Sequence, residues 1–373
     1  MGLKFAQPQR EANRKDSHLS LRRDQTNPRL PSFPQYDRAV GRQAPPAAAT
    51  SLHLSADLVL LSRFIVFLCS FLGGLFSGCS NLPPVSPHAD AAVTVGTVAG
   101  DGLTELSGMA PSLRESDVFW THNDSGGAPE IFALNLRGET RANVAIDSAT
   151  ARDWEDIATF TWQGKPWILI ADVGDNTATR YDLALYLLPE PALTSGATAQ
   201  SLPAKVTYTL RFSFPDGPRD CEGVAVSPAT NEILLISKRT EPPVLYSLRL
   251  PDLSTPSSAT SQVATRLTAL AGIIAPTAAE RAIPGRLGQY RSHVTAFDLA
   301  PDGSAAAVLT YGNIWLYRRD PTESWATALT HAPERLPVRG LPQAEALSFS
   351  PDSQQLWLTT EATNAPIQRY YLP

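Results

Sequence analysis

From Ala92 to the end of the chain, short apolar runs rich in Val, Ile, Leu, Phe, Trp and Thr alternate with turns rich in Gly, Pro, Asp and Asn. We find no convincing amphipathic helix of ordinary length in this region. A succession of short strand-like runs separated by turn residues is typical of an all-β fold. We therefore expect antiparallel sheet throughout residues 92–373.

A short motif recurs along these runs and indicates that the strands form repeats. The motif reads ELSGMAP at Glu105–Pro111, EGVAVSP at Glu222–Pro228 and EALSFSP at Glu345–Pro351. Thr295–Pro301 fits the same frame with Thr in the first place, and Glu155 begins a similar run that lacks the proline. Each repeat then supplies a second and a third apolar run. Repetition of this kind predicts the blades of a β-propeller, which closes its sheets into a ring.

The repeats predict five blades. A sixth is possible if residues 250–292 hide another, although Ala271–Arg291 fits a long inserted loop better. The last repeat holds only three strands, and the spare run Ala92–Val98 could complete it and close the ring. A β-sandwich of similar length is the alternative fold, but sandwiches lack such internal similarity.

The Glu of the repeated motif should face the central channel. Glu105, Glu155, Glu222 and Glu345 share one repeat position, so we expect them at one level around the axis. Carboxylates so close to one another disfavour each other's ionisation unless a positive charge lies among them. Carboxylate and amide oxygens could hold a cation such as Ca²⁺, or the acids could accept backbone hydrogen bonds and fasten blade to blade. The predicted metal ligands are Glu105, Asp124, Glu155, Asp175, Glu222 and Glu345.

The loops after the second strand of each repeat should open on one face, at the mouth of the channel. Acids beside Lys and Arg suit a metal ion with an anionic ligand such as a phosphate, and His122 could act as a base or a metal ligand. The Asp and Asn residues could instead only cap turns. The predicted ligand-binding residues are His122, Asn123, Asp124, Asp172, Asn176, Arg180, Lys238, Arg239 and Glu361.

Charge and composition narrow the function classes. The whole chain has a formal net charge of −5, but residues 80–373 alone carry ten more acidic than basic side chains. An acidic body argues against nucleic acid as a partner, and we expect a monomer. The scattered His residues argue against a zinc cluster, and no Gly-x-Ser-x-Gly elbow or nucleotide-type phosphate loop is present. Outside the N-terminal segment only Cys221 remains, so no internal disulfide can form.

The N-terminal part indicates export. Residues 1–56 are expected to be disordered, or to be an extension created by a misassigned translation start. Segment 57–79 has the apolar core of a signal peptide and ends in Ser-Gly-Cys79, which resembles a bacterial lipobox with Phe76 where Leu is preferred. Cys79 is the predicted lipidation site, and residues 80–91 form a linker. An uncleaved anchor and an ordinary secretory signal are the alternatives.

Four motifs carry a resemblance to a known group of proteins. They are ELSG at Glu105–Gly108, THNDSG at Thr121–Gly126, DWEDIA at Asp153–Ala158 and ADVGDN at Ala171–Asn176. The chain resembles a group of mostly uncharacterised bacterial secreted propeller proteins, over most of residues 93–373. It is more distantly similar to phytase-like and esterase-like propellers and to calcium lactonase propellers. That resemblance implies Ca²⁺ in or near the channel and hydrolysis of esters or phosphoesters.

The sequence thus predicts an exported, lipid-anchored propeller of the outer membrane or cell envelope that faces the periplasm or the surface. Ser80 after Cys79 gives no acidic retention signal, which favours the outer membrane in a Gram-negative host. The propeller is expected to bind a small or anionic ligand at the channel mouth, with calcium as cofactor. A metal-dependent phytase-like or esterase-like hydrolase is one alternative. A protein-interaction scaffold with a purely structural acidic ring is the other.

Overall fold

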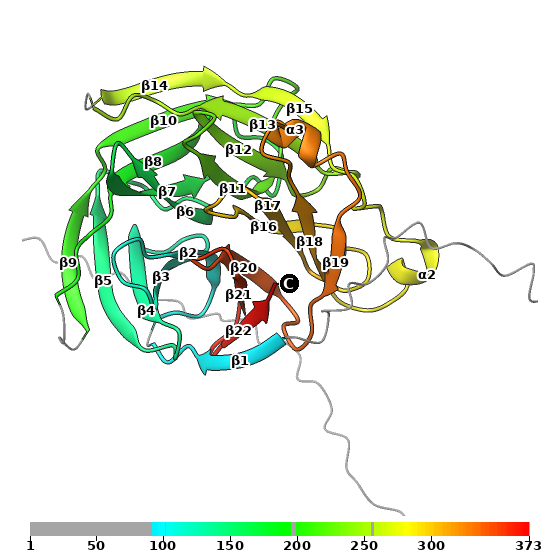
Figure 1. Cartoon of the computed structure of the whole chain (residues 1–373), viewed down its shortest axis with the longest axis horizontal. Helices are drawn as coiled ribbons and strands as arrows, with labels where there is room; N and C mark the ends of the chain where they lie inside the picture. The colour runs from blue at the N-terminus through cyan, green and yellow to red at the C-terminus, as the bar shows by residue number, and fades with distance from the viewer. Residues whose placement is uncertain (1–91, 101, 195–198, 255–256, 373) are drawn as a thin grey trace, which may run out of the picture. The chain divides into compact units, whose positions relative to one another are not determined.

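The computed structural model describes residues 92–372, apart from residues 101, 195–198 and 255–256. The predicted extension, signal segment, linker and lipidation site Cys79 lie outside these described residues. In the described chain the fold is a five-bladed β-propeller, as the repeats predict, and residues 250–292 contribute no sixth blade. Figure 1 shows the five sheets arranged in a ring.

Each blade is a sheet that begins with its innermost strand. Blade 1 holds β2 (Leu106–Pro111), β3 (Val118–Asn123), β4 (Glu130–Asn135) and β5 (Thr140–Asp147). Blade 2 holds β6 (Trp154–Trp162), β7 (Lys165–Asp172), β8 (Leu183–Pro189) and β10 (Tyr208–Ser213). Blade 3 holds β11 (Cys221–Ser227), β12 (Glu232–Ser237), β13 (Val244–Arg249) and β15 (Thr265–Ala269). Blade 4 holds β16 (Val294–Leu299), β17 (Ala305–Thr310), β18 (Asn313–Arg318) and β19 (Glu334–Pro337).

Blade 5 is completed by the N-terminal strand, as predicted. Its order is β20 (Ala344–Phe349), β21 (Gln355–Thr360), β22 (Pro366–Tyr371) and then β1 (Ala92–Thr97), which pairs antiparallel with β22. After β1 the chain crosses to blade 1, and the Ala99 N–H donates to the Gly138 carbonyl at 3.0 Å. This closure joins the two ends of the ring and covers the free edge of the last blade.

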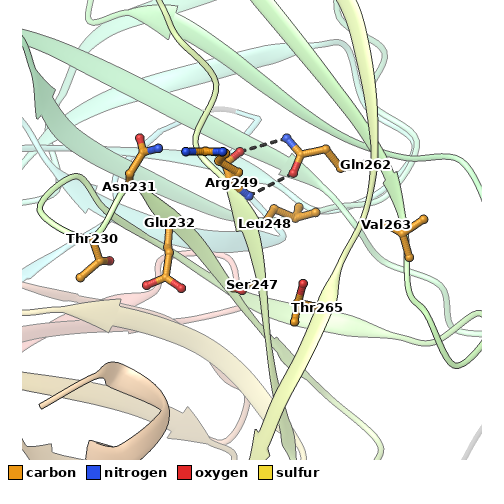
Figure 2. A pocket seen from close by; sticks show the side chains of 9 residues that line it. All are labelled: Thr230, Asn231, Glu232, Ser247, Leu248, Arg249, Gln262, Val263 and Thr265. Carbon is orange, nitrogen blue, oxygen red and sulfur yellow. Dashed lines mark hydrogen bonds between the residues drawn. The ribbon is translucent and has the colours of Figure 1, made fainter.

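Blades 1 and 2 each gain an outer strand that the sequence pattern did not predict. β9 (Gln200–Lys205) runs parallel to β5, and β14 (Ser257–Val263) runs parallel to β10. The Gln262 side chain near the end of β14 bonds both the backbone N–H and the carbonyl of Arg249 at 3.0 Å, which attaches this strand to blade 3 (Figure 2). The hollow beside it is lined mainly by polar side chains.

The core lies between the blades. Five clusters of buried apolar side chains fill the five interfaces, and the cluster between blades 5 and 1 includes Val98 and Leu103 from the closing segment. Burying each large apolar side chain contributes about 1.5–3 kcal/mol. The ring is therefore held together by the same kind of contact at its closure as at every other interface.

The described residues contain two helices, each of four residues. α2 (Ala278–Arg281) lies in the inserted loop between β15 and β16, and α3 (Trp325–Ala328) lies between β18 and β19. Neither helix of the described chain has the length or the apolar sequence needed to cross a membrane.

Candidate cation site at the channel mouth

The inner strands present two levels of side chains at one end of the channel. Each inner strand has a β-bulge near its start, where one residue has no partner on the neighbouring strand. The bulged residues in blades 1 to 5 are Gly108, Glu155, Glu222, Thr295 and Glu345. Two residues before them stand Leu106, Asp153, Asp220, His293 and Gln343. Three of the four predicted ring acids therefore share one structural position.

The prediction that Glu105 belongs to this ring is not met. The strand register aligns Gly108, not Glu105, with Glu155, so the sequence alignment of blade 1 was displaced by three residues. Glu105 is exposed. Gly108 has a φ of 74°, and a Cβ there would lie 2.9 Å from Nε2 of His122. A left-handed bulge with no room for a side chain requires glycine, so blade 1 has no acid at this level.

Blade 1 contributes Asp124 instead, from the loop between β3 and β4. One carboxylate oxygen each from Asp124, Asp153 and Glu155 lie within 4.8 Å of one another. Nearby cations pair with other acids, and no described Lys or Arg forms an ion pair with these three. The Oδ1 atom of Asp124 is buried without a hydrogen-bond partner in the described chain. We call these three residues the open triad.

A glycine lets the open triad converge. An ideal Cβ on Gly174 would lie 2.1 Å from Oε1 of Glu155 and 2.6 Å from Oδ2 of Asp153. The backbone N–H of Gly174 donates to the Asp153 carbonyl at 3.1 Å, which holds the loop after β7 against the start of β6. The two carboxylates therefore approach bare backbone, and any other residue at position 174 would displace them.

A second group of acids, Glu155, Asp220 and Glu222, also lies within 4.8 Å, but its blade 3 members already have cationic partners. Lys238 pairs with Oε1 of Glu222, and both side chains are less than 10% exposed. The Arg239 guanidinium bonds Oδ2 of Asp220 at 2.5 Å, while Oδ1 of Asp220 accepts the backbone N–H of Asp175 at 2.9 Å. Protein cations thus occupy the place that a metal would need.

The electrostatics of the two groups differ accordingly. Burial raises the pKa of Glu155 well above its usual range, and the charges of Glu222 and Asp124 raise it further. Burial also raises the pKa of Glu222, but Lys238 is the largest opposing influence. Burial and then Asp153 raise the pKa of Asp124 to about 6. Burial alone would lower the pKa of Lys238, but attraction from Glu222, Tyr311, Glu155 and Glu345 raises it overall.

Several predicted residues of blade 2 support the loop itself. Both oxygens of Asp175 accept backbone N–H groups, from Thr179 at 2.9 Å and Arg180 at 2.7 Å. The Arg180 guanidinium forms a buried ion pair with Asp172 at 2.8 Å and donates to the Gly174 carbonyl at 2.6 Å. The contacts of these three side chains therefore stabilise the turn and the loop. This is the alternative in which the polar residues of the mouth only cap turns, and it applies to Asp175, Asp172 and Arg180.

The remaining predicted mouth residues divide between core and rim. His122 is fully buried, packs edge-on against Trp154 at 5.7 Å, and has its pKa lowered to about 4 by burial. The Asn123 side-chain oxygen accepts the backbone N–H groups of Thr104 and Glu105, both at 3.2 Å. Asn176 accepts from the Arg239 guanidinium. His122 is thus enclosed between blades 1 and 2.

The far side of the mouth, over blades 4 and 5, holds a network that the sequence did not reveal. The Tyr311 hydroxyl donates to Glu345 at 2.7 Å and accepts from Arg286 of the inserted loop at 2.7 Å. Arg286 also lies 3.7 Å from Glu345, and Lys238 lies 5.8 Å from the centre of the Tyr311 ring. Burial and then Glu345 raise the pKa of Glu361 to about 8. Glu345 and Glu361 therefore belong to this network and not to the open triad.

The predicted site residues did not include Asp153, Asp220, Arg286, His293 or Tyr311. The Asp-x-Glu spacing of Asp153-Trp-Glu155 and Asp220-Cys-Glu222 was the available signal for the first two. Arg286 lies in an insertion, where repeat alignment gives no position. His293 occupies the ring position of Asp153 and Asp220, is half-buried, and has its pKa lowered to about 4 by burial and by Lys238 and Arg239.

The donor set of the open triad fits a divalent cation with oxygen ligands. Three carboxylates converge, none of them forms an ion pair with a described Lys or Arg, and one of their oxygens is buried without a hydrogen-bond partner. The charge of Lys238 opposes the rise in the pKa of Glu155 and Asp124 without pairing with either. Calcium and magnesium take oxygen ligands, whereas zinc sites use Cys and His. The only described cysteine, Cys221, is buried, and the His122 side chain points into the interface between blades 1 and 2. A calcium-type ion is thus compatible with the residues present.

No protein-family model matches the chain, and no curated protein matches it. A solved structure of a luciferin-regenerating enzyme aligns with 74% of this chain and 94% of its own, at 11% sequence identity and a TM-score of 0.38. A similarity of that size carries no argument about function, and the propeller assignment depends on the sheets described above.

Proposed function

We propose that this protein is an exported, lipid-anchored propeller whose channel mouth binds a calcium ion together with a small anionic ligand. The observation that supports the cation is the open triad: Asp124, Asp153 and Glu155 converge on bare backbone with no protein cation among them. Uncompensated charges in a partly buried place are costly, and a bound cation removes that cost. The triad supplies three of the roughly six to eight oxygens that calcium takes.

Calcium is favoured over magnesium because of ligand number and origin. The triad residues come from two blades and a loop, which gives an irregular set of oxygens, and calcium accepts irregular geometry at about 2.3–2.6 Å. Magnesium requires near-octahedral geometry at about 2.0–2.1 Å and retains its waters. The remaining calcium positions would be open to water or to a ligand from the channel mouth.

The anionic ligand is inferred from the basic side of the mouth. Lys238 and Arg239 come from blade 3 and Arg286 from the loop inserted between blades 3 and 4, and Arg286 is the most exposed of them, at 45%. A carboxylate or phosphate could then contact the calcium with one oxygen and Arg286 with another, since guanidinium binds such groups in a bidentate manner. Arg286 would keep Tyr311 as its hydrogen-bond partner in that arrangement.

A metal-dependent hydrolase is the second candidate, and His293 is the observation that favours it. This residue shares a ring position with Asp153 and Asp220, and burial with the nearby Lys238 and Arg239 lowers its pKa to about 4, so its imidazole is neutral at pH 7. A neutral imidazole at the mouth could accept a proton from an attacking water. The scaffold alternative requires instead that the acids bind no cation.

Calcium titration of chelator-treated protein by calorimetry, with melting temperature measured in parallel, tests the proposal. We expect one site with a Kd on the order of 0.1 mM, as in extracellular calcium modules. The Asp153→Asn variant should lose it. The matched variant Asp220→Asn, at the same ring position in blade 3, should retain the affinity within about threefold, because its carboxylate already pairs with Arg239.

Four outcomes decide among the candidates. Absence of calcium heat and of any shift in melting temperature would leave only the scaffold. Equal losses in the two Asp variants would contradict the assignment to the open triad. Calcium-dependent turnover of p-nitrophenyl phosphate or acetate, abolished in His293→Ala, would establish the hydrolase. Binding of phenyl phosphate only in the presence of calcium, weakened in Arg286→Gln, would support the ligand-binding proposal.

The export part of the proposal has its own test. Mass spectrometry of the mature protein from a membrane fraction should identify a lipid-modified N-terminal peptide that begins at Cys79. A peptide from residues 1–50 would contradict both the processing and the misassigned start. Cys79→Ser should release the protein from the membrane fraction, whereas Cys221→Ser should leave it there, because Cys221 is buried inside the propeller.

A further inference from the structure

A second cavity lies at the opposite end of the channel from the open triad. It has a volume of about 320 Å³ and is formed where the inner strands of blades 1 to 4 end. Its main walls are Pro111, Phe160, Val226, Leu299, Pro301 and Trp325. The five bulges stand near the beginnings of the same strands, and Glu222 and Ser227 are five residues apart on β11. At about 3.3 Å per residue, the cavity lies roughly 16 Å from the acidic ring.

The walls of this cavity are mainly apolar, and their one carboxyl group already has hydrogen-bond partners. Phe160, Val226, Leu299 and Trp325 are each less than 10% exposed, yet they border open space. Asp298 is the one titratable residue among the lining residues of this cavity. Its two oxygens accept the backbone N–H groups of Leu299 and Phe349, each at 2.8 Å, which fastens blade 4 to blade 5. A charged ligand would therefore find no free partner of opposite charge in this cavity, whereas a neutral ligand needs no such partner.

The aromatic wall is held in place before any ligand arrives. The Trp325 indole N–H donates to the Ser227 hydroxyl at 3.2 Å. The Arg319 guanidinium lies 4.6 Å from the centre of the Trp325 ring and donates to the Gly303 carbonyl at 3.0 Å. The Trp325 side chain is thus held by a hydrogen bond at its indole nitrogen and by the Arg319 guanidinium over its ring. A preformed wall avoids the entropic cost of ordering side chains on binding.

We propose that this cavity binds a small, uncharged, mainly apolar molecule that contains an aromatic ring. The volume is at the lower end of the range for ligand sites, about 300–1,000 Å³, and so admits one or two fused or linked rings. Phe160 and Trp325 supply surfaces for offset or edge-on ring contacts. The ligand needs no ion at the mouth, because the only titratable side chain that lines the cavity, Asp298, is already hydrogen-bonded and the acidic ring is about 16 Å away. The site is therefore independent of the proposed calcium function.

Fluorescence titration of the full-length protein with 6-propionyl-2-dimethylaminonaphthalene, a neutral probe with two fused aromatic rings, tests the proposal. We expect saturable binding at one site with a Kd on the order of 10 µM, given a modest binding energy per atom. Ala229 lines the cavity and is exposed, so Ala229→Trp should fill the entrance and weaken binding at least tenfold. The matched variant Ala279→Trp, at an exposed position on α2, should bind as the unmodified protein does.

Each result supports or overturns the assignment. Non-saturable binding, or equal affinity in Ala229→Trp and the unmodified protein, would overturn it, and the second result would place the probe elsewhere on the chain. Thr161→Trp, at another exposed lining position, replaces Ala229→Trp if that variant melts at a lower temperature. A change of more than about threefold in probe affinity on adding calcium would overturn the independence of the two ends of the channel.

Discussion

Blades 2 and 3 present the same Asp-x-Glu sequence at the same ring positions, yet the two pairs have different partners. In blade 3, Glu222 pairs with Lys238 and Asp220 pairs with Arg239. Val173 occupies the place in blade 2 that Lys238 has in blade 3, as the strand registers show, and it is fully buried. The residue that follows the second strand therefore decides whether a ring acid is neutralised by the protein or left for a cation from solution.

The same comparison extends to the loops. The blade 2 loop pairs its own Arg180 with Asp172, so this cation opposes the rise in the pKa of Asp153 but forms no ion pair with a described ring acid. The blade 3 loop turns Lys238 toward the channel, where its ammonium also lies close to Tyr311. Blades 2 and 3 thus share the same sheet geometry but differ in the charged partners of their ring acids. Substitutions in blade 3 and then around the blade 2 acids test this difference.

The largest effect is expected when blade 3 loses its cation. Lys238→Met leaves the buried Glu222 without an ion pair, and breaking a buried pair costs about 3–5 kcal/mol. Urea unfolding in the presence of a chelator measures the loss, and calcium should restore part of it because blade 3 then resembles blade 2. Lys165→Met, at an exposed position on β7, is the control and should change stability little. An unchanged unfolding free energy in Lys238→Met would contradict the comparison.

A smaller effect is expected when the convergence of the blade 2 acids is blocked. Gly174→Ala places a methyl group against the Glu155 and Asp153 carboxylates. Overpacking of this kind costs about 1–3 kcal/mol, and calcium affinity measured by calorimetry should fall at least tenfold. Gly127→Ala is the matched control, because a Cβ at that position meets no atom within 4 Å. Equal calcium affinity in the two variants would show that the ion lies elsewhere.

The smallest effect concerns pH. Because the pKa of Asp124 is raised from 3.8 to about 6, the folded protein keeps this proton where the unfolded chain has lost it. The resulting stability is complete below pH 3.8 and is lost as the pH rises through 6. Asp124→Asn should remove that loss, so in chelator at pH 8 it should be more stable by about 1 kcal/mol, after allowance for solvent screening.

Chemical denaturation from pH 4 to pH 8, with and without calcium, measures how the stability of the Asp124→Asn variant depends on pH and on the ion. Asp124→Asn should gain stability without the ion and lose the stabilisation that calcium gives to the unmodified protein. A variant that loses stability at pH 8 in chelator would show that the Asp124 carboxylate has a protein partner in solution. A variant that keeps the calcium effect would remove Asp124 from the open triad.

The fold was predictable because it is repeated. The alternation of apolar runs and turns predicts the strands from local sequence. Because a motif recurs five times, the ring of blades can be predicted without knowing which distant residues are in contact. The spare strand Ala92–Val98 was predictable because the last repeat is one strand short. β9 and β14 were not, because each adds to a blade by parallel pairing after a long connection, and their sequences give no sign of the partner.

The candidate site was predictable only in part. Asp124, Glu155 and Glu222 were named because they occupy repeat positions, and the structure brings their carboxylates to the mouth. Glu105 was misplaced because the bulge in blade 1 falls at Gly108, three residues later, and bulge positions depend on pairing with β3. Asp175 was assigned to the metal, but its carboxylate caps a turn, a choice made by backbone geometry that residue type does not reveal.

The sequence alone predicted the repeated sheets, the strand that completes the last blade and the acidic character of the mouth, because each follows from local pattern and composition. The choice between five and six blades was made by the structure. The tertiary structure decided which acids are compensated. Lys238, Arg239 and Arg180 pair with acids that lie 16, 19 and 8 residues away in the sequence. Which acid each cation meets depends on distances of a few ångströms that the strand register sets. The attraction between two charges weakens with distance and strengthens as burial lowers the local dielectric, so the pairing is fixed only when the blades are assembled.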